Sequence, residues 1–331
     1  MRAVTVIEGD RLEVVERDVP APEPDQVLVR VHGAGVNRAD LLQRAGLYPA
    51  PPGSPVDIPG MEFAGVVEAV GAEVDDAFNG ATVFGIVGGG AQADYLTTKA
   101  AHCAFVPAGL DLVAMGGVPE AFITAHDAMV TQAHLVAREW VLVHAVGSGV
   151  GTAAMQLAEA FRARTVGTAR SASKLERCAG LGLDVGIVPP RRDDGTLDVD
   201  LLASQIVDAT GGGADVTVDL VGGAYVEADI AAAAPKGRIM LIGALAGGTA
   251  TLGILGVMGK RLSVVGTMLR SRSAAEKSDA TRAFERDVVP LLEREVIAPV
   301  VDSVLPIEKA SDAYDLVASD ATFGKVILDC R

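Results

Sequence analysis

The chain has few cysteines and no cluster of positive charge. Its 331 residues include only three cysteines, Cys103, Cys178 and Cys330, and no two of them form a C-x-x-C pair. This spacing excludes a disulfide framework and a thiolate zinc cluster, and it favours a reducing, cytoplasmic location. The formal net charge is -15. Because this charge would repel a phosphate backbone, we expect no nucleic-acid partner.

Long uninterrupted apolar segments are also lacking. The N-terminus carries Glu8, Asp10 and Glu13, where a secretion signal needs an apolar run after a basic start. The range 239–259 has 21 residues without a charge, which is the length of a membrane span. Six glycines interrupt this range, and it lies between two expected strands, so we expect no membrane-spanning helix.

A strand, a glycine turn and a helix follow one another in the middle of the chain. The apolar run Trp140–His144 predicts a central parallel strand, and the small and apolar residues of Thr152–Ala158 predict a helix packed on it. Unpaired N–H groups at the start of such a helix suit a dinucleotide pyrophosphate. The residues expected to contact it are Gly147, Ser148, Gly149, Val150 and Gly151. Their spacing is not G-x-G-x-x-G, so a tight turn without a ligand is the alternative.

The next strand, expected over Arg164–Ala169, ends in positive charge. An NAD site usually offers an acidic residue here to the ribose hydroxyls, and this chain has none. Arg and Lys side chains favour a 2′-phosphate. We therefore expect NADPH as the cofactor, with its 2′-phosphate held by Arg170, Ser171 and Lys174. The alternative is that these cations only solvate the start of a helix.

Strand signals recur downstream, with helix-length segments between most of them. They fall at 184–188, 216–220, 238–242 and 262–266. This alternation predicts an α/β fold with a doubly wound, Rossmann-type parallel sheet, whose ligand lies at the carboxyl ends of the strands. Val221, Gly243 and Leu245 follow two of those ends, and we expect them to contact the cofactor. A turn without a cofactor remains the alternative for Gly243.

The first 120 residues are mainly β. Expected strands such as Gln26–Val31 and Glu62–Val70 are separated by many Gly and Pro residues, and helical periodicity begins only at Arg38–Arg44. The tail after Thr267 returns to helices and ends in a strand, Lys325–Leu328, which we expect to rejoin the N-terminal domain. The predicted segments are 1–122, 123–267 and 268–331, with the Rossmann domain inserted into a mainly β substrate domain.

Short motifs are distributed over the whole chain: NRADLLQRAGLY at 37–48, GMEFAG at 60–65, HAVGSGVG at 144–151 and FGKV at 323–326. Together they resemble the quinone oxidoreductase branch of the medium-chain dehydrogenase/reductase superfamily. Four further motifs resemble the tumour-suppressor-inducible NAD(P)H quinone oxidoreductase group of that branch: YPAPPG at 48–53, GGGAQ at 88–92, PEAFITA at 119–125 and LRSR at 269–272.

The resemblance implies a GroES-like substrate domain joined to a Rossmann domain. It implies hydride transfer from NADPH to a small-molecule acceptor, either a quinone or a related conjugated carbonyl. It also implies a homodimer in which two Rossmann sheets join edge to edge, and the pairing strand here would be Leu262–Gly266.

Two zinc-ligand positions of the zinc-dependent relatives are changed in this chain. Those relatives place Cys where Asn37 stands and His where Met61 stands, and they keep a glutamate at the position of Glu62. Without thiolate or imidazole donors a catalytic zinc has no first coordination shell, so we expect a metal-free enzyme. The five histidines show no paired metal-binding spacing, and we expect core or surface roles for them.

The resemblance also assigns catalytic roles. Tyr48 and Asn37 would lie near the nicotinamide ring and the substrate carbonyl, as hydrogen-bond donors to the oxygen or to the nicotinamide ribose. Loop packing is the alternative for Tyr48, and capping of the Arg38–Arg44 helix is the alternative for Asn37. A reduced quinone can take protons from solvent, so a dedicated general acid is not required.

Other residues are expected to hold the cofactor. Thr124 and the backbone of Gly324 and Lys325 would hold the nicotinamide carboxamide, and Leu269 and Arg270 are further expected contacts.

The chain departs from its relatives after the third Rossmann strand, where many have a Tyr that touches the adenine phosphate. Here Pro189-Pro190 is followed by Arg191-Arg192. Arg170 also replaces a small residue, which adds a cation to the same phosphate.

Three competing functions share parts of this interpretation. An NADPH-dependent reductase of alkenal or enone double bonds would have the same donor, fold and metal-free site. An NADPH-binding protein with little turnover, like the crystallin-like members of the superfamily, would have the same fold without the activity. A zinc alcohol dehydrogenase would require stoichiometric zinc.

Overall fold

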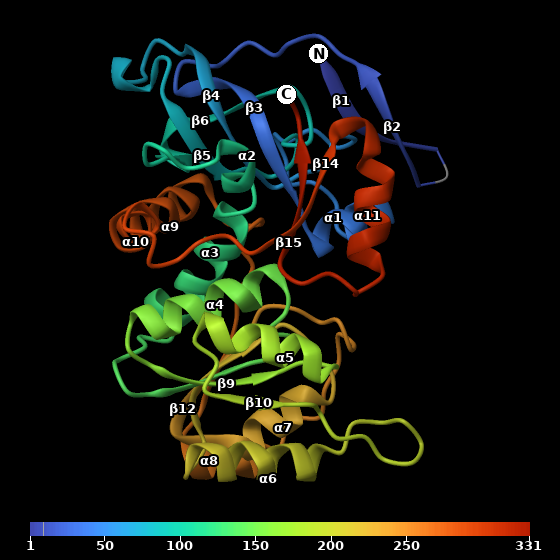
Figure 1. Ribbon diagram of the computed structural model, residues 1–331, viewed down its shortest axis with the longest axis vertical. Helices are drawn as coiled ribbons and strands as arrows, with labels where there is room; N and C mark the ends of the chain where they lie inside the picture. The colour runs from blue at the N-terminus through green and yellow to red at the C-terminus, as the bar shows by residue number, and fades with distance from the viewer. Residues whose placement is uncertain (9) are drawn as a thin grey trace. The chain divides into compact units, whose positions relative to one another are not determined.

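The computed structural model describes residues 1–8 and 10–331 and divides the chain into two compact units. The first unit comprises Met1–Thr124 and Leu269–Arg331, and the second comprises Ala125–Met268. The chain therefore leaves the first unit once and returns to it. Figure 1 shows this by colour, because the first unit combines the blue to teal start of the chain with its orange-brown to red end, and the segments between them, green to orange, make up the second unit.

The main sheet of the first unit has seven strands in the order β14-β15-β3-β4-β5-β7, with β6 paired to β3. A separate antiparallel pair is formed by β1 and β2. The last strand of the chain pairs antiparallel with β3 and parallel with β14, which confirms that it rejoins the N-terminal part. The strands of this unit are β1 (Arg2–Ile7), β2 (Arg11–Glu16), β3 (Gln26–Val36), β4 (Glu62–Val70), β5 (Thr82–Ile86), β6 (Tyr95–Lys99), β7 (Cys103–Phe105), β14 (Val301–Pro306) and β15 (Lys325–Asp329).

The strand β3 is longer than the sequence predicted, because it continues through Gly33 and Gly35 to Val36. Both glycines lie where a side chain would collide with a neighbour. A Cβ on Gly33 would be 2.2 Å from the carbonyl oxygen of Val113, and one on Gly35 would be 2.1 Å from Oε1 of Glu62. The glycines allow close approach of neighbouring groups and do not end the strand here.

Six α-helices accompany the strands among the described residues of the first unit. The predicted helix over Arg38–Arg44 is confirmed with the same bounds as α1. The apolar side chains of α11 join the core of the main sheet, where Tyr314 is fully buried with Phe63 and Val29. The helices are α1, α2 (Leu112–Met115), α3 (Pro119–His126), which ends beyond Thr124, α9 (Ala274–Asp287), α10 (Val289–Glu293) and α11 (Ala310–Ala318).

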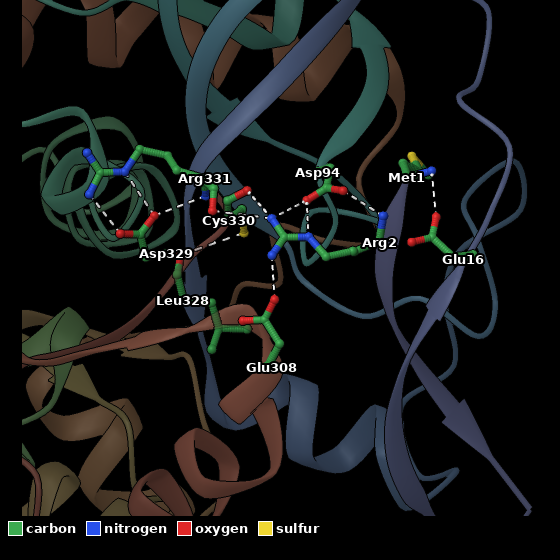
Figure 2. A network of polar contacts seen from close by, with 9 residues as sticks. All are labelled: Met1, Arg2, Glu16, Asp94, Glu308, Leu328, Asp329, Cys330 and Arg331. Atoms are coloured by element: carbon green, nitrogen blue, oxygen red, sulfur yellow. Dashed lines mark hydrogen bonds and ion pairs between the residues drawn. The ribbon is translucent and has the colours of Figure 1, made fainter.

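Arg2 ties the two ends of the chain together within the first unit (Figure 2). The Nη2 of Arg2 lies 2.8 Å from Oδ1 of Asp94, and the backbone N–H of Arg2 donates to Oδ2 of Asp94. The guanidinium also donates to the carboxylate of Glu308 and to the carbonyl oxygen of Cys330. These bonds help to hold the returning C-terminal segment against β1.

The second unit contains a six-stranded, all-parallel sheet in the order β10-β9-β8-β11-β12-β13. Each of these strands was predicted from sequence, although β12 begins five residues earlier than expected, at Ala233. The order reverses between β8 and β11, which is where ligands bind in doubly wound folds. The strands are β8 (Trp140–Val143), β9 (Arg164–Thr168), β10 (Val185–Ile187), β11 (Ala214–Asp219), β12 and β13 (Ser263–Gly266).

Helices cover both faces of this sheet, so its central strand β8 is buried and apolar, whereas the edge strand β13 is partly exposed. Figure 1 shows α4 and α5 on one face and α6, α7 and α8 on the other. The uncharged range 239–259 forms the end of β12, a loop and all of α8 except its last residue, and no helix among the described residues is long and apolar enough to span a bilayer. The helices are α4 (Gly149–Ala160), α5 (Ala172–Cys178), α6 (Val199–Thr210), α7 (Tyr225–Ala232) and α8 (Ile254–Lys260).

Candidate active site

A buried cluster of one cation, one carboxylate and one amide lies in the first unit. The Nζ of Lys325 is 2.5 Å from Oε1 of Glu62 and 2.6 Å from Oδ1 of Asn37. Asn37 completes the triangle by donating from Nδ2 to the same Glu62 oxygen, at 2.9 Å. The side chain of Glu62 is 0% exposed and that of Lys325 is 5% exposed. Each charge is therefore held in a low-dielectric surrounding by its partner.

Strand pairing explains why residues so far apart in sequence meet. Asn37 directly follows β3, Glu62 begins β4 and Lys325 begins β15. Because β4 and β15 are both hydrogen-bonded to β3 over the end near Val36, the three residues fall at the same end of the sheet. Gly35 of β3 leaves the space that the Glu62 carboxylate fills.

The cluster fixes the orientation of the Asn37 side chain. An ammonium group has donors only, so the amide oxygen must face Lys325 and the amide nitrogen must face Glu62. Asn37 is at the N-cap position of α1, yet its side chain is used in this cluster, and its backbone N–H donates to Asp40. One N–H of the Asn37 amide therefore remains available to donate to another group.

The structure engages one of the two backbone polar groups of Lys325 that were expected to hold the carboxamide. Its backbone N–H donates to the carbonyl oxygen of Val300 at 2.8 Å, so that N–H is not available to a carboxamide. This bond follows from the parallel pairing of β15 with β14. Gly324, just before it, has a φ of 94°, and a Cβ there would be 2.1 Å from the same Val300 oxygen. Lys325 contributes to the cluster through its side chain.

Arg270 holds the loop that carries Tyr48. Its guanidinium donates to the carbonyl oxygens of Gly88 and Tyr48 and to Oε1 of Gln43, and it lies 4.9 Å from the centroid of the Tyr48 ring. Arg270 is only 4% exposed, and Leu269 beside it is also buried. These bonds use one N–H of each guanidinium nitrogen and attach Arg270 to the Tyr48 loop, and the cofactor contact expected for Arg270 stays a prediction.

The half-buried Tyr48 is a weaker acid than an exposed tyrosine. Burial raises the pKa of its hydroxyl, and the negative charge of Glu120 raises that pKa further, while Arg270 opposes both effects. The Tyr48 hydroxyl therefore stays protonated at neutral pH and can act as a hydrogen-bond donor.

Glu120 and Thr124 lie on one helix, α3, and both are partly exposed. The backbone N–H of Glu120 donates to Oε2 of Glu62 at 2.9 Å, which fixes the start of α3 to the buried cluster. Desolvation raises the pKa of the Glu120 carboxyl to about 8, and the nearby Glu62 carboxylate adds to the effect, whereas Lys325 opposes it. Glu120 is thus a carboxylic acid that keeps its proton at neutral pH.

The turn after β8 in the second unit presents helix N–H groups. Gly149 and Val150, at the start of α4, have no carbonyl within the helix for their N–H groups, and both are partly exposed. Ser148 is the N-cap, and its hydroxyl accepts from the N–H of Gly151 at 3.1 Å. A Cβ on Gly151 would lie 2.5 Å from the carbonyl oxygen of Ala145, so only glycine allows this close packing. The turn therefore fits a pyrophosphate group.

The helix α4 begins three residues earlier than the sequence predicted, so Gly149, Val150 and Gly151 belong to its first turn. His144, just before the turn, is fully buried, and its ring nitrogens lie 2.8 Å from Thr168 Oγ1 and 2.8 Å from Asp229 Oδ1. These bonds confine His144 to a supporting position under the turn.

The cations predicted to bind a 2′-phosphate follow β9 directly. Arg170 is exposed, and Lys174 is half-buried in the first turn of α5. Ser171 is the N-cap of α5, and its hydroxyl lies 3.2 Å from that of Ser173 without capping a backbone N–H. Burial raises the pKa of the Tyr225 hydroxyl, and the charges of Arg191 and Arg170 oppose this rise. Both guanidinium groups therefore act on the same tyrosine at the carboxyl ends of the strands.

The loops after β11 and β12 are tied to Asp219, the last residue of β11. The Oδ1 of Asp219 accepts hydrogen bonds from the N–H groups of Val221 and Gly222. Its backbone carbonyl oxygen accepts a hydrogen bond from the N–H of Gly243. A Cβ on Gly243 would be 2.4 Å from the carbonyl oxygen of Leu220. The side chain of Leu245 is 55% exposed. These residues lie at the sheet edge where doubly wound folds bind nucleotides.

The structure shows no group of three or more His, Cys, Asp or Glu side chains arranged to hold a metal within residues 1–8 and 10–331. Met61 is 3% exposed, and all three cysteines are free and buried. The Glu62 carboxylate already accepts from Lys325, Asn37 and the Glu120 N–H. These three bonds satisfy the carboxylate of Glu62, the position at which the zinc-dependent relatives also carry a glutamate.

Two family profiles match the chain. The profile described as the alcohol dehydrogenase GroES-like domain matches residues 23–134, and the one described as zinc-binding dehydrogenase matches residues 149–286. Among curated relatives, a quinone oxidoreductase of Lama guanicoe is 31% identical over 338 residues, which cover 99% of this chain and 97% of the relative.

Solved structures agree over the full length. An NAD-dependent alcohol dehydrogenase is 31% identical, with a TM-score of 0.83 and coverage of 99% of both chains. A mycobacterial protein complexed with NADPH is 26% identical, with a TM-score of 0.85 and coverage of 99% of both chains.

A GroES-like domain joined to a six-stranded parallel sheet of this order defines an oxidoreductase of the medium-chain dehydrogenase/reductase superfamily. Within that superfamily the chain belongs to the quinone oxidoreductase-like family, which confirms the resemblance inferred from its motifs.

Two residues at these sites were not assigned by sequence reasoning. Glu120 lies in the PEAFITA motif at 119–125, but neither composition nor spacing reveals that its carboxyl is desolvated. Arg191 was noted only as a departure from the relatives, and its proximity to Tyr225 depends on how the chain folds after β10.

Proposed function

We propose that this protein is a zinc-independent NADPH:quinone oxidoreductase. The observation that carries the proposal is the Asn37–Glu62–Lys325 cluster, because it leaves one oriented amide N–H at the position where zinc-dependent relatives have a ligand. A fixed donor of this kind stabilises negative charge on a substrate oxygen during reduction. The full-length similarity to a quinone oxidoreductase supports this substrate class.

In the proposed reaction, bound NADPH supplies a hydride to the acceptor. The first turn of α4, with Gly147 and Ser148 before it, binds the pyrophosphate, and Arg170, Ser171 and Lys174 bind the 2′-phosphate. Val221, Gly243 and Leu245 flank the nucleotide. Asn37 and Tyr48 donate hydrogen bonds toward the acceptor oxygen or the nicotinamide ribose, while Thr124 and Gly324 orient the carboxamide.

The absence of zinc from the proposed mechanism has a physical reason. The Lys325 ammonium supplies a positive charge next to Glu62, and a divalent cation at the same place would be repelled by it. Asn37 and Met61 also lack the thiolate and imidazole donors that Zn²⁺ prefers. The chain's own cation thus takes the electrostatic place of a metal.

A panel of quinones, enones and primary alcohols, with NADPH or NADP⁺ consumption as the readout, tests this function. The proposal expects oxidation of NADPH by at least one quinone. Consumption of NADP⁺ with an alcohol only after zinc is added would support a zinc alcohol dehydrogenase, and no turnover with any acceptor would support a binding protein.

We further propose a homodimer through the edge strand β13. This strand ends the sheet order, so one side of it has no partner strand within the second unit. The nearby helix α8 exposes Ile254 (64%), Leu255 (84%) and Met258 (67%), which is unusual for large apolar side chains on a monomer. Leu255→Glu should shift sedimentation toward a monomer, whereas Leu201→Glu on α6 should leave it unchanged.

A further inference from the structure

Three acidic side chains lie at or near the Asn37–Glu62–Lys325 cluster: Glu62, Asp40 and Glu120. Among the described residues, Glu120 is the one of these three whose carboxyl has no hydrogen-bond partner. Its backbone N–H is bonded to Glu62, and no bond is made by its side-chain oxygens to residues 1–8 or 10–331. The neighbouring acids differ, since Glu62 accepts three bonds and Asp40 accepts from Asn37, Gly60 and Gln92. The residue is partly exposed, and its charge acts on Tyr48, which is proposed to face the substrate.

We propose that Glu120 is the proton donor that completes reduction of conjugated carbonyl acceptors in this site. The inference rests on the proposed function and adds to it a catalytic acid for the reduction of α,β-unsaturated ketones and aldehydes.

Charged groups from several elements act on the carboxyl of Glu120. Glu62 begins β4, Lys325 begins β15 and Asp40 lies on α1, while Arg270 and Lys277 come from the segment around the start of α9. Glu62 and Asp40 disfavour ionisation of Glu120, and Lys325 and Arg270 favour it. Desolvation outweighs the two cations, and it holds the pKa of Glu120 near 8. A group with such a pKa is protonated, yet still acidic enough to donate, at neutral pH.

Tyr48 is a poorer candidate for the same role. Burial and the charge of Glu120 both raise the pKa of its hydroxyl above that of an ordinary tyrosine. A proton is therefore held much more tightly by Tyr48 than by Glu120. Tyr48 can still donate a hydrogen bond to the substrate oxygen without releasing its proton.

The proposed step is balanced. The β-carbon of the enone accepts a hydride from NADPH, and the resulting enolate is the species to be protonated. The O–H bond of Glu120 breaks, a C–H bond forms at the α-carbon, and the Glu120 carboxylate regains a proton from water. The sum is enone, NADPH and H⁺ giving saturated carbonyl and NADP⁺. Carbon is protonated slowly by solvent, whereas the oxygens of a reduced quinone are protonated readily, so enones depend more on the acid.

Glu120→Gln tests this role, because it keeps the size of the side chain and removes the acidic proton. In the full-length protein with NADPH, we expect kcat for an enone to fall by about 100-fold. For a quinone we expect less than about a 10-fold loss, because solvent replaces the acid. The wild-type enone rate should decline as pH rises through about 8, and this decline should be absent in the variant.

Three comparisons keep the result interpretable. Glu73→Gln, at an exposed position of the same unit, should match wild type, and Glu120→Asp should retain the decline with pH. NADPH binding measured by fluorescence should be unchanged in all variants. If Glu120→Gln has the wild-type enone rate and pH profile, the role of Glu120 is wrong while the proposed function stands. If none of the quinones and enones tested supports oxidation of NADPH by the wild-type protein, the proposed function is wrong, and this inference is wrong with it.

Discussion

The Lys325 ammonium and the Glu62 carboxylate form a buried ion pair, with 2.5 Å between Nζ and Oε1. The two residues are far apart in sequence and meet because β15 and β4 both pair with β3. The pair holds the Asn37 amide in one orientation, so it connects the fold of the first unit to the chemistry that we propose for it.

Lys325→Met should destabilise the protein by about 3–5 kcal/mol, because it leaves the Glu62 carboxylate buried without its cation. The double variant Lys325→Met/Glu62→Gln should recover much of that loss, since it removes both charges. Urea unfolding followed by circular dichroism measures both. A double variant no more stable than Lys325→Met would contradict the ion-pair account.

Asn37→Ala should lower kcat for a quinone by roughly 10²–10³-fold, which is the usual effect of removing one donor that stabilises developing charge. NADPH affinity should change little, because the proposed phosphate contacts are in the second unit. Asn79→Ala, at an exposed position, is the matched control. A change confined to KM would instead show that Asn37 only helps to bind the substrate.

Arg170→Ala should weaken NADPH binding by roughly 10- to 100-fold, in line with the loss of a charged hydrogen bond. NADH binding should be unchanged, because NADH has no 2′-phosphate. Isothermal titration calorimetry measures both affinities, and Arg177→Ala, near the end of the helix α5 that follows Arg170, is the control. An unchanged preference between the two cofactors would show that Arg170 does not contact the 2′-phosphate.

Glu120→Gln should become more stable than wild type as pH rises. In the folded protein Glu120 keeps its proton up to about pH 8, whereas in the unfolded chain it ionises near its ordinary pKa of 4.5. Between pH 4.5 and pH 8, ionisation of Glu120 in the unfolded chain therefore lowers the stability of the wild-type protein as pH rises. This loss of stability is complete above pH 8. Thermal melting of both proteins from pH 4 to pH 9 should show a gap in Tm that widens with pH and then levels. A gap independent of pH would contradict the raised pKa.

Sequence reasoning was most successful where local patterns decide the structure. The helix α1 was predicted with its observed bounds, and all six strands of the second unit were predicted, because buried parallel strands are short apolar runs with breaks between them. The strand β3 was predicted too short, since Gly33 and Gly35 resemble strand-ending residues in sequence but serve close packing here.

The candidate site was less predictable. Asn37 and Lys325 were each selected, but 288 residues separate them, and no local pattern reveals that their side chains bond. Arg270 was selected as a cofactor contact, yet its bonds to Gly88 and Gln43 are tertiary contacts that only the fold reveals. The raised pKa of Glu120 likewise depends on burial, which composition does not show.

The most direct test of this account is NADPH-dependent quinone reduction by protein treated with a strong chelator, with zinc measured on the same sample by atomic spectroscopy. The account predicts unchanged turnover at a zinc content far below one ion per chain, because Lys325 supplies the positive charge beside Glu62. Loss of activity on chelation, with recovery when one equivalent of zinc is returned, would contradict it.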